Sequence, residues 1–60
     1  MSNEYIVTGQ GYEHNDPHKQ TLLLHGTFQA SSEADATNQF KRSYLEDGVE
    51  IIRVYSTELT

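Results

Sequence analysis

The sequence predicts an α+β domain with the element order β-β-α-β, in which a three-stranded mixed sheet is covered on one face by a single helix. Two observations predict this class. Residues 31–48 (SSEADATNQFKRSYLEDG) have the spacing of an amphipathic helix, and three other segments are rich in strand-forming residues. Because 60 residues are enough for only one small core, residues 1–60 should form a single domain.

Residues 3–12 (NEYIVTGQGY) are predicted to form the first strand, since the YIVT stretch is typical of strands. Gly9 and Gly11 leave one face of its second half without side chains. This pattern predicts a close approach by the helix or by an aromatic ring. The glycines are not a dinucleotide-binding fingerprint, because no third glycine and no helix follow in register.

Residues 13–19 (EHNDPHK) are predicted to form a turn, since Asn-Asp-Pro is a strong turn signal. The turn also contains His14 and His18 near two carboxylates, which resembles part of a metal site. Pro17, however, rules out the regular helix that would place both imidazoles on one face, and no third ligand follows at zinc-like spacing. We therefore interpret these histidines as turn residues and expect no metal and no other cofactor.

Residues 20–30 (QTLLLHGTFQA) are predicted to form the second strand, with Leu22, Leu24, Phe28 and Ala30 on the core face. Gly26 should leave room against the sheet for a ring from the helix, either Phe40 or Tyr44. Leu23 and His25 fall on the opposite face.

The predicted helix has a start signal, an apolar face and a stop signal. Ser31 and Ser32 are suitable N-caps, and the acidic residues that follow suit the positive end of the helix dipole. Gly48 is suited to end the helix, because glycine adopts the left-handed conformation without steric cost. The apolar face repeats every four residues at Ala36, Phe40 and Tyr44.

Residues 49–57 (VEIIRVYST) are predicted to form the last strand. Strict alternation places Ile52 and Val54 toward the helix, and Ile51 and Tyr55 on the other face. The tail, residues 58–60, is expected to fray.

The first two strands should pair as an antiparallel hairpin, and the helix then leads to a third strand that runs parallel to the second. We favour the strand order 2-1-3 over 1-2-3, because it lets the helix cover the middle of the sheet. The expected core consists of Ile6 or Val7, Leu22, Leu24, Phe28, Ala36, Phe40, Tyr44, Ile52 and Val54.

Composition limits the classes of partner and compartment. The chain has nine acidic and four basic residues, which disfavours direct binding to nucleic acid and suits either solubility or a basic partner. It has no cysteine, and its N-terminus lacks the apolar run of a signal peptide. No stretch approaches the roughly 18 apolar residues that span a membrane, so we expect a cytoplasmic protein.

A helix on one face leaves the other face of the sheet uncovered, and apolar side chains should gather there. Such patches usually mark an interface, and a domain of this size has a marginal core. We therefore expect a non-enzymatic protein-interaction or regulatory module, as a homodimer, with an unknown protein partner. The interface residues are expected to be Leu23, His25, Ile51, Arg53 and Tyr55.

Two alternatives remain open. An acidic inhibitor could block a nucleic-acid-binding protein through charge complementarity. Its partner surface would consist of Glu33, Asp35, Glu46, Asp47 and Glu50. Alternatively, the open sheet face could stack the bases of a single-stranded nucleic acid on Tyr12, His25, Arg53 and Tyr55, although the acidic net charge makes nucleic acid an unfavourable partner.

The stretch 27–54 (TFQASSEADATNQFKRSYLEDGVEIIRV) resembles a pattern that is common in very small proteins of phages and prophages. In this pattern a strand ends at Ala, a helix opens with Ser and Glu and carries small residues plus an aromatic, and an Ile- and Val-rich strand follows. The resemblance implies an accessory protein that acts by binding a host or phage protein.

Overall fold

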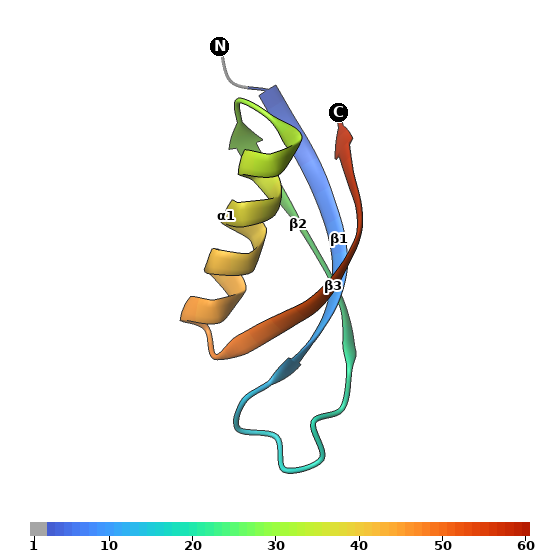
Figure 1. Ribbon diagram of the computed structural model, residues 1–60, viewed down its shortest axis with the longest axis vertical. Coiled ribbons are helices and arrows are strands. Elements are labelled where there is room, and N and C mark those ends of the chain that lie inside the picture. The colour runs from blue at the N-terminus through green and yellow to red at the C-terminus, as the bar shows by residue number, and fades with distance from the viewer. Residues whose placement is uncertain (1–2) are drawn as a thin grey trace.

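The computed structural model describes residues 3–60 and contains three strands and one helix in the expected order. The hairpin strands are β1 (Asn3–Glu13) and β2 (Leu22–Ala30); α1 (Glu33–Glu46) and β3 (Val49–Leu59) follow. The helix lies along one face of the sheet, and the β1–β2 loop extends past the end of the helix (Figure 1). The α+β class is therefore confirmed.

The strand order is β2-β1-β3, as favoured, but the expectation of a mixed sheet is wrong. β1 pairs antiparallel with both neighbours. β3 does run in the same direction as β2, as a helical crossover requires. Because β1 lies between them, the two parallel-running strands never pair, and every hydrogen-bonded pair of strands in the sheet is antiparallel.

The helix ends follow the sequence signals. The Ser32 hydroxyl accepts a hydrogen bond from the backbone N–H of Asp35 at 3.2 Å, which satisfies one of the unpaired amides of the first turn. After the last turn, Gly48 adopts a φ of +81°, the left-handed conformation that favours glycine. These two residues set the length of α1.

The core is centred on Phe40, which is fully buried against the middle strand. Its ring meets Phe28 edge-on, with centroids 6.1 Å apart, and Tyr44 in a similar geometry at 5.2 Å. Gly9 makes room for this ring, as its sequence position predicted, since a Cβ there would lie 2.9 Å from Phe40 Cε2. The buried apolar residues are Tyr5, Val7, Ala30, Ala36, Phe40 and Val49.

Two irregularities in β3 overturn the predicted alternation at Ile51 and Ile52, whereas Val54 faces the core as predicted. The register against β1 shifts between Thr8 and Gly9 and again between Gln10 and Gly11, leaving Tyr55 and Ile52 without a direct partner. Each shift is a bulge, and a bulge changes which side chains face the core. Ile51 therefore packs beside Val54 on the core, whereas Ile52, predicted in the core, is 51% exposed.

The ends of the strands also differ from the prediction. β2 begins at Leu22, which lies near the loop and is exposed rather than part of the core. The C-terminal residues expected to fray belong to the sheet. β3 continues to Leu59, and the backbone N–H of Thr60 donates to the Glu4 carbonyl at 2.9 Å.

Candidate functional site: the open face of the sheet

The face of the sheet opposite α1 is uncovered, and we call it the open face. In β1 the odd-numbered residues from Tyr5 to Gly11 are buried toward the helix, so the even-numbered residues face away from it. Residues directly opposite each other in antiparallel strands share a face. The register thus places on the open face Ile6, Thr8, Gln10 and Tyr12 from β1, Leu23, His25 and Thr27 from β2, and Arg53, Ser56 and Glu58 from β3.

Large apolar surfaces on this face remain in contact with solvent. Leu23 is 74% exposed and Ile6 is 41% exposed. A sheet with one open face normally places polar side chains there. The exposed apolar side chains are therefore available for a contact outside the domain.

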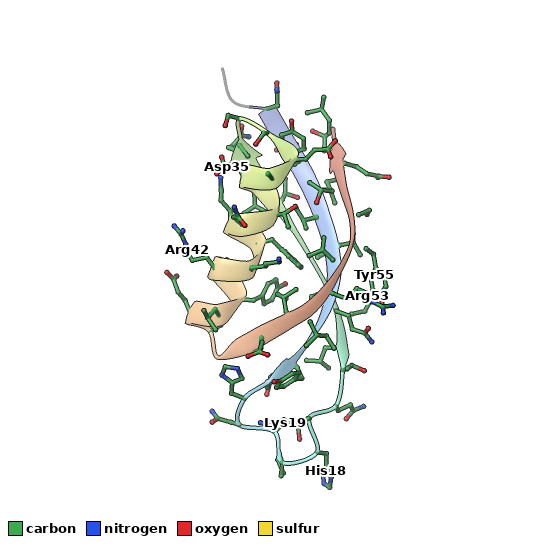
Figure 2. The ribbon with its side chains drawn as sticks, viewed as in Figure 1. His18, Lys19, Asp35, Arg42, Arg53 and Tyr55 are labelled. Carbon is green, nitrogen blue, oxygen red and sulfur yellow. The ribbon has the colours of Figure 1, made fainter. Side chains whose placement is uncertain are left out.

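Tyr55 also lies on the open face, as alternation predicted, although it has no direct partner in β1. Its hydroxyl donates to Gln10 Oε1 at 2.7 Å, which holds the ring over the middle strand. The Arg53 guanidinium carbon lies 6.0 Å from the centre of the same ring. Figure 2 shows Tyr55 and Arg53 together on the side of the sheet away from the helix. The ring is 49% exposed even though its position is fixed by this hydrogen bond.

The structure brings together four of the five expected interface residues and separates the fifth. Leu23, His25, Arg53 and Tyr55 lie on the open face. Ile51 lies opposite Gly11 and packs against the core from the helix side. Sequence reasoning also missed Ile6, which alternation with the buried Val7 could have placed on this face.

A second polar cluster lies where β1 and β3 meet the loop. Glu50 accepts hydrogen bonds from the Tyr12 hydroxyl and from the His14 ring, each at 3.2 Å. Lys19 donates to the His14 carbonyl at 2.7 Å, and its ammonium lies 5.3 Å from the centre of the Tyr12 ring. The loop between β1 and β2 is thus tied to the sheet.

The hydrogen bonds of this cluster shift two pKa values in opposite directions. The His14 ring, followed by the Tyr12 hydroxyl, stabilises the carboxylate and lowers the pKa of Glu50 below its ordinary value. The same Tyr12–Glu50 hydrogen bond favours the protonated phenol and raises the pKa of Tyr12. Among residues 3–60, no three His, Cys, Asp or Glu side chains come close enough together to hold a metal ion.

The residues expected to form an acidic partner surface lie in separate places. Glu33 and Asp35 are in the first turn of α1, whereas Glu46 and Asp47 are at its other end, roughly 20 Å away for a helix of this length. Asp35 also accepts a hydrogen bond from Gln39, at 3.3 Å. Since Glu50 belongs to the loop cluster, the five side chains do not form one continuous surface.

Comparisons with protein-family models, with curated proteins and with solved structures found no match to this chain. The helix in the described part of the chain is too short and too polar to cross a membrane.

Proposed function

We propose that this protein is a small, non-enzymatic, homodimeric protein-binding module of the cytoplasm, and that it contacts its partner through the open face of the sheet. One observation carries the proposal. Tyr55 is held in place by Gln10, flanked by Arg53, and still half exposed. The hydroxyl of Tyr55 already has a hydrogen-bond partner within the protein, whereas about half of its surface is still exposed and can be buried by a binding partner.

The energetics of protein interfaces support this use of the open face. Tyrosine and arginine are enriched among the residues that contribute most to binding, and they are most effective near the centre of a contact patch. A ring that is already fixed loses little conformational entropy when a partner covers it. Leu23 and Ile6 extend the apolar part of the patch on β2 and β1.

The charge of the chain favours a basic partner. The formal net charge is −5, so the field around the molecule attracts basic proteins and repels acidic ones. On the open face itself, Glu58 lies opposite Ile6 and can pair with a cation at the edge of the contact. The resemblance to small phage and prophage proteins supports an accessory protein that binds a host or phage target.

The test is affinity capture from a lysate of the source organism, followed by measurement of the dissociation constant for the captured protein. Replacing Tyr55 with Ala should weaken binding by more than about 2 kcal/mol, the range of strong interface residues. Leu23→Ala should also weaken it. Leu45→Ala is the matched control, because Leu45 is similarly exposed, at 56%, but lies at the end of α1.

The proposal predicts equal binding by the wild-type protein and the Leu45 variant. It is wrong if Tyr55→Ala and Leu23→Ala bind as tightly as the wild type while Leu45→Ala does not. Circular dichroism of each variant should confirm that the fold is retained.

A second candidate function has one specific observation in its favour. The four side chains that could stack nucleic-acid bases, namely Tyr12, His25, Arg53 and Tyr55, all lie on the open face. Against it, Tyr12 is bonded to Glu50 on that face, and the net charge of −5 repels phosphates. A gel-shift experiment with single-stranded oligonucleotides at low salt separates the two, since a protein-binding module should give no shift.

A further inference from the structure

The outer edge of β2 presents backbone groups that the sheet does not use. The backbone N–H of Thr60 donates to the Glu4 carbonyl, so the backbone groups of Glu4 point toward β3. Successive residues of a strand direct their backbone groups to opposite sides. The even-numbered residues of β1 therefore pair with β3, and the odd-numbered residues pair with β2. The odd-numbered β1 residues lie opposite Leu24, Gly26 and Phe28. The intervening β2 residues therefore direct their backbone groups outward: Leu23, His25, Thr27 and Gln29.

Two helix side chains confirm this orientation independently. Tyr44 donates from its hydroxyl to the His25 carbonyl at 3.0 Å, and Gln39 donates to the Gln29 carbonyl at 2.9 Å. Both carbonyls must therefore point away from β1. A carbonyl oxygen has two lone pairs, so each can also accept a hydrogen bond from a strand beside it. Thr27, between them, accepts no hydrogen bond from either helix side chain.

The two edges of the sheet are not equivalent. β3 carries two register shifts, and bulges of this kind prevent another strand from pairing along an edge. β2 pairs with β1 without a register shift over Leu22–Ala30 and contains no proline and no charged Lys, Arg, Asp or Glu side chain. A regular edge without proline or Lys, Arg, Asp or Glu side chains accepts an added strand.

We propose that the β2 edge pairs antiparallel with β2 of a second copy about a two-fold axis at Gly26, forming one continuous sheet across the dimer. This register places His25 opposite Thr27 of the second copy, and Leu23 opposite its Gln29. On the helix side it places Leu24 opposite Phe28 of the second copy. This inference rests on the homodimer of the proposed function and names the strand through which its two copies pair. The open faces of the two copies stay uncovered and join into one surface of twice the area.

A local pair of opposite charges next to the β2 edge favours a second copy as the occupant, and it offsets the repulsion between two chains that each carry a net charge of −5. Beside β2, a hollow of about 230 Å³ is lined by Phe28, Gln39, Arg42, Ser43 and Glu46. Arg42 projects outward from α1 (Figure 2). Tyr44 is level with the proposed axis, because its hydroxyl reaches the carbonyl next to Gly26. Arg42 and Glu46 lie two positions to either side of Tyr44, so the two-fold brings each Arg42 opposite the Glu46 of the other copy.

The size of the domain provides a reason for pairing. Six apolar residues are buried in the described chain, and the chain has no cysteine with which to form a disulfide. Domains of this size often gain stability from a partner subunit. Phe28 is partly buried within one copy and would be covered further by pairing along β2.

The test is a charge exchange followed by sedimentation equilibrium. The wild-type protein should sediment at twice its 6.8 kDa mass at micromolar concentration. Arg42→Glu and Glu46→Arg should each raise the dimer dissociation constant about tenfold or more, because two ion pairs become repulsive. The double variant, with both residues exchanged, should restore the wild-type constant. Lys41→Glu is the matched control, since it makes the same charge change at a neighbouring exposed position.

A monomeric wild-type protein at 100 µM would overturn the inference, and so would a dimer that Arg42→Glu leaves intact. If Tyr55→Ala dissociates the dimer instead, the two copies contact each other through the open face and the edge pairing is wrong. Circular dichroism excludes unfolding as the cause. A monomer that still binds a partner through Tyr55 would overturn the edge pairing and leave the protein-binding function standing. A dimer that pairs along β2 but binds no partner would support the edge pairing and contradict the protein-binding function.

Discussion

The ring of Phe40 packs directly on the backbone of Gly9. A Cβ at position 9 would lie 2.6 Å from the Arg53 carbonyl oxygen of β3 as well as 2.9 Å from the ring. The contact therefore joins the helix and two strands at one point, and it requires a residue without a side chain in the middle strand.

Replacing Gly9 with Ala should lower the free energy of unfolding by about 1–3 kcal/mol, the usual cost of overpacking a core. β1 and β3 would have to move apart, because the nearest opposing atom is the Arg53 carbonyl oxygen in the backbone of β3. Urea denaturation followed by circular dichroism measures the loss.

Gly26→Ala is the matched comparison for Gly9→Ala. A Cβ at Gly26 would meet no backbone atom within 3.8 Å: it would approach the end of the Phe28 ring at 2.8 Å and would lie at ordinary contact distance, 3.8 Å, from Phe40 Cδ1. The partly buried Phe28 ring can rotate away. The loss should be smaller than at Gly9. Equal losses at the two glycines would contradict the role assigned to the backbone contact.

The helix N-cap gives a second prediction. Ser32→Ala removes the hydroxyl that accepts the Asp35 amide and should destabilise the protein by about 1 kcal/mol. Ser31→Ala is the control, since its side chain is not the N-cap and should matter little. Thermal unfolding of both variants would show whether position 32 alone carries the cap.

A third prediction concerns acid stability. Because the pKa of Glu50 is lowered in the folded protein, the carboxylate stabilises the fold above its ordinary pKa of 4.5. That contribution is lost as the pH falls from this value through the lowered pKa. His14→Ala removes the largest cause of the shift and should bring the pKa of Glu50 closer to 4.5, as measured by NMR titration of the side-chain carboxyl carbon.

His18→Ala is the control for the titration. His18 lies in the same exposed turn, and its backbone N–H, rather than its ring, is bonded to Asp16. The pKa of Glu50 should be unchanged in this variant. A similar upward shift in both variants would mean that the general field of the loop, and not the His14 hydrogen bond, controls Glu50.

The fourth prediction isolates the hydrogen bond that positions Tyr55. Tyr55→Phe keeps the ring but removes its 2.7 Å bond to Gln10. The Gln10→Ala variant breaks the same bond from the other strand. A double-mutant cycle on the free energy of unfolding should give a coupling of about 0.5–1 kcal/mol, the net value of one such bond.

The coupling should be absent from the pair Tyr55→Phe and Ser32→Ala, whose positions share no contact in the structure. If the Tyr55–Gln10 cycle also gives no coupling, the ring is not fixed by this bond. The entropic argument for Tyr55 as a binding residue would then fail.

The sequence predicted β2 and the helix well because their signals are local. Ser32 caps a nearby backbone amide and Gly48 adopts the left-handed conformation just after the helix, so both ends of α1 could be predicted from the local sequence. The alternation in β2 correctly separated Leu23 and His25 from Leu24 and Phe28. The candidate site was predicted in part, because four of its five residues lie on the open face.

The prediction failed in β3, where the decisive interactions come from elsewhere in the chain. A bulge has no signature within VEIIRVYST, because it depends on how that strand meets the glycine-containing half of β1. The exchanged positions of Ile51 and Ile52 follow from it. The hydrogen bond between Tyr55 and Gln10 could not be predicted either, since it joins residues 45 positions apart.

The sequence alone determined the number, order and type of the elements and the helix caps, because propensity and periodicity act on short segments. It favoured the strand order β2-β1-β3 without deciding it, and the structure has this order. The tertiary structure decided that every pairing is antiparallel, that Ile51 rather than Ile52 joins the core, and that Tyr55 is fixed on the open face. These outcomes depend on contacts between distant segments, and such contacts exist only once β1 lies between the other two strands.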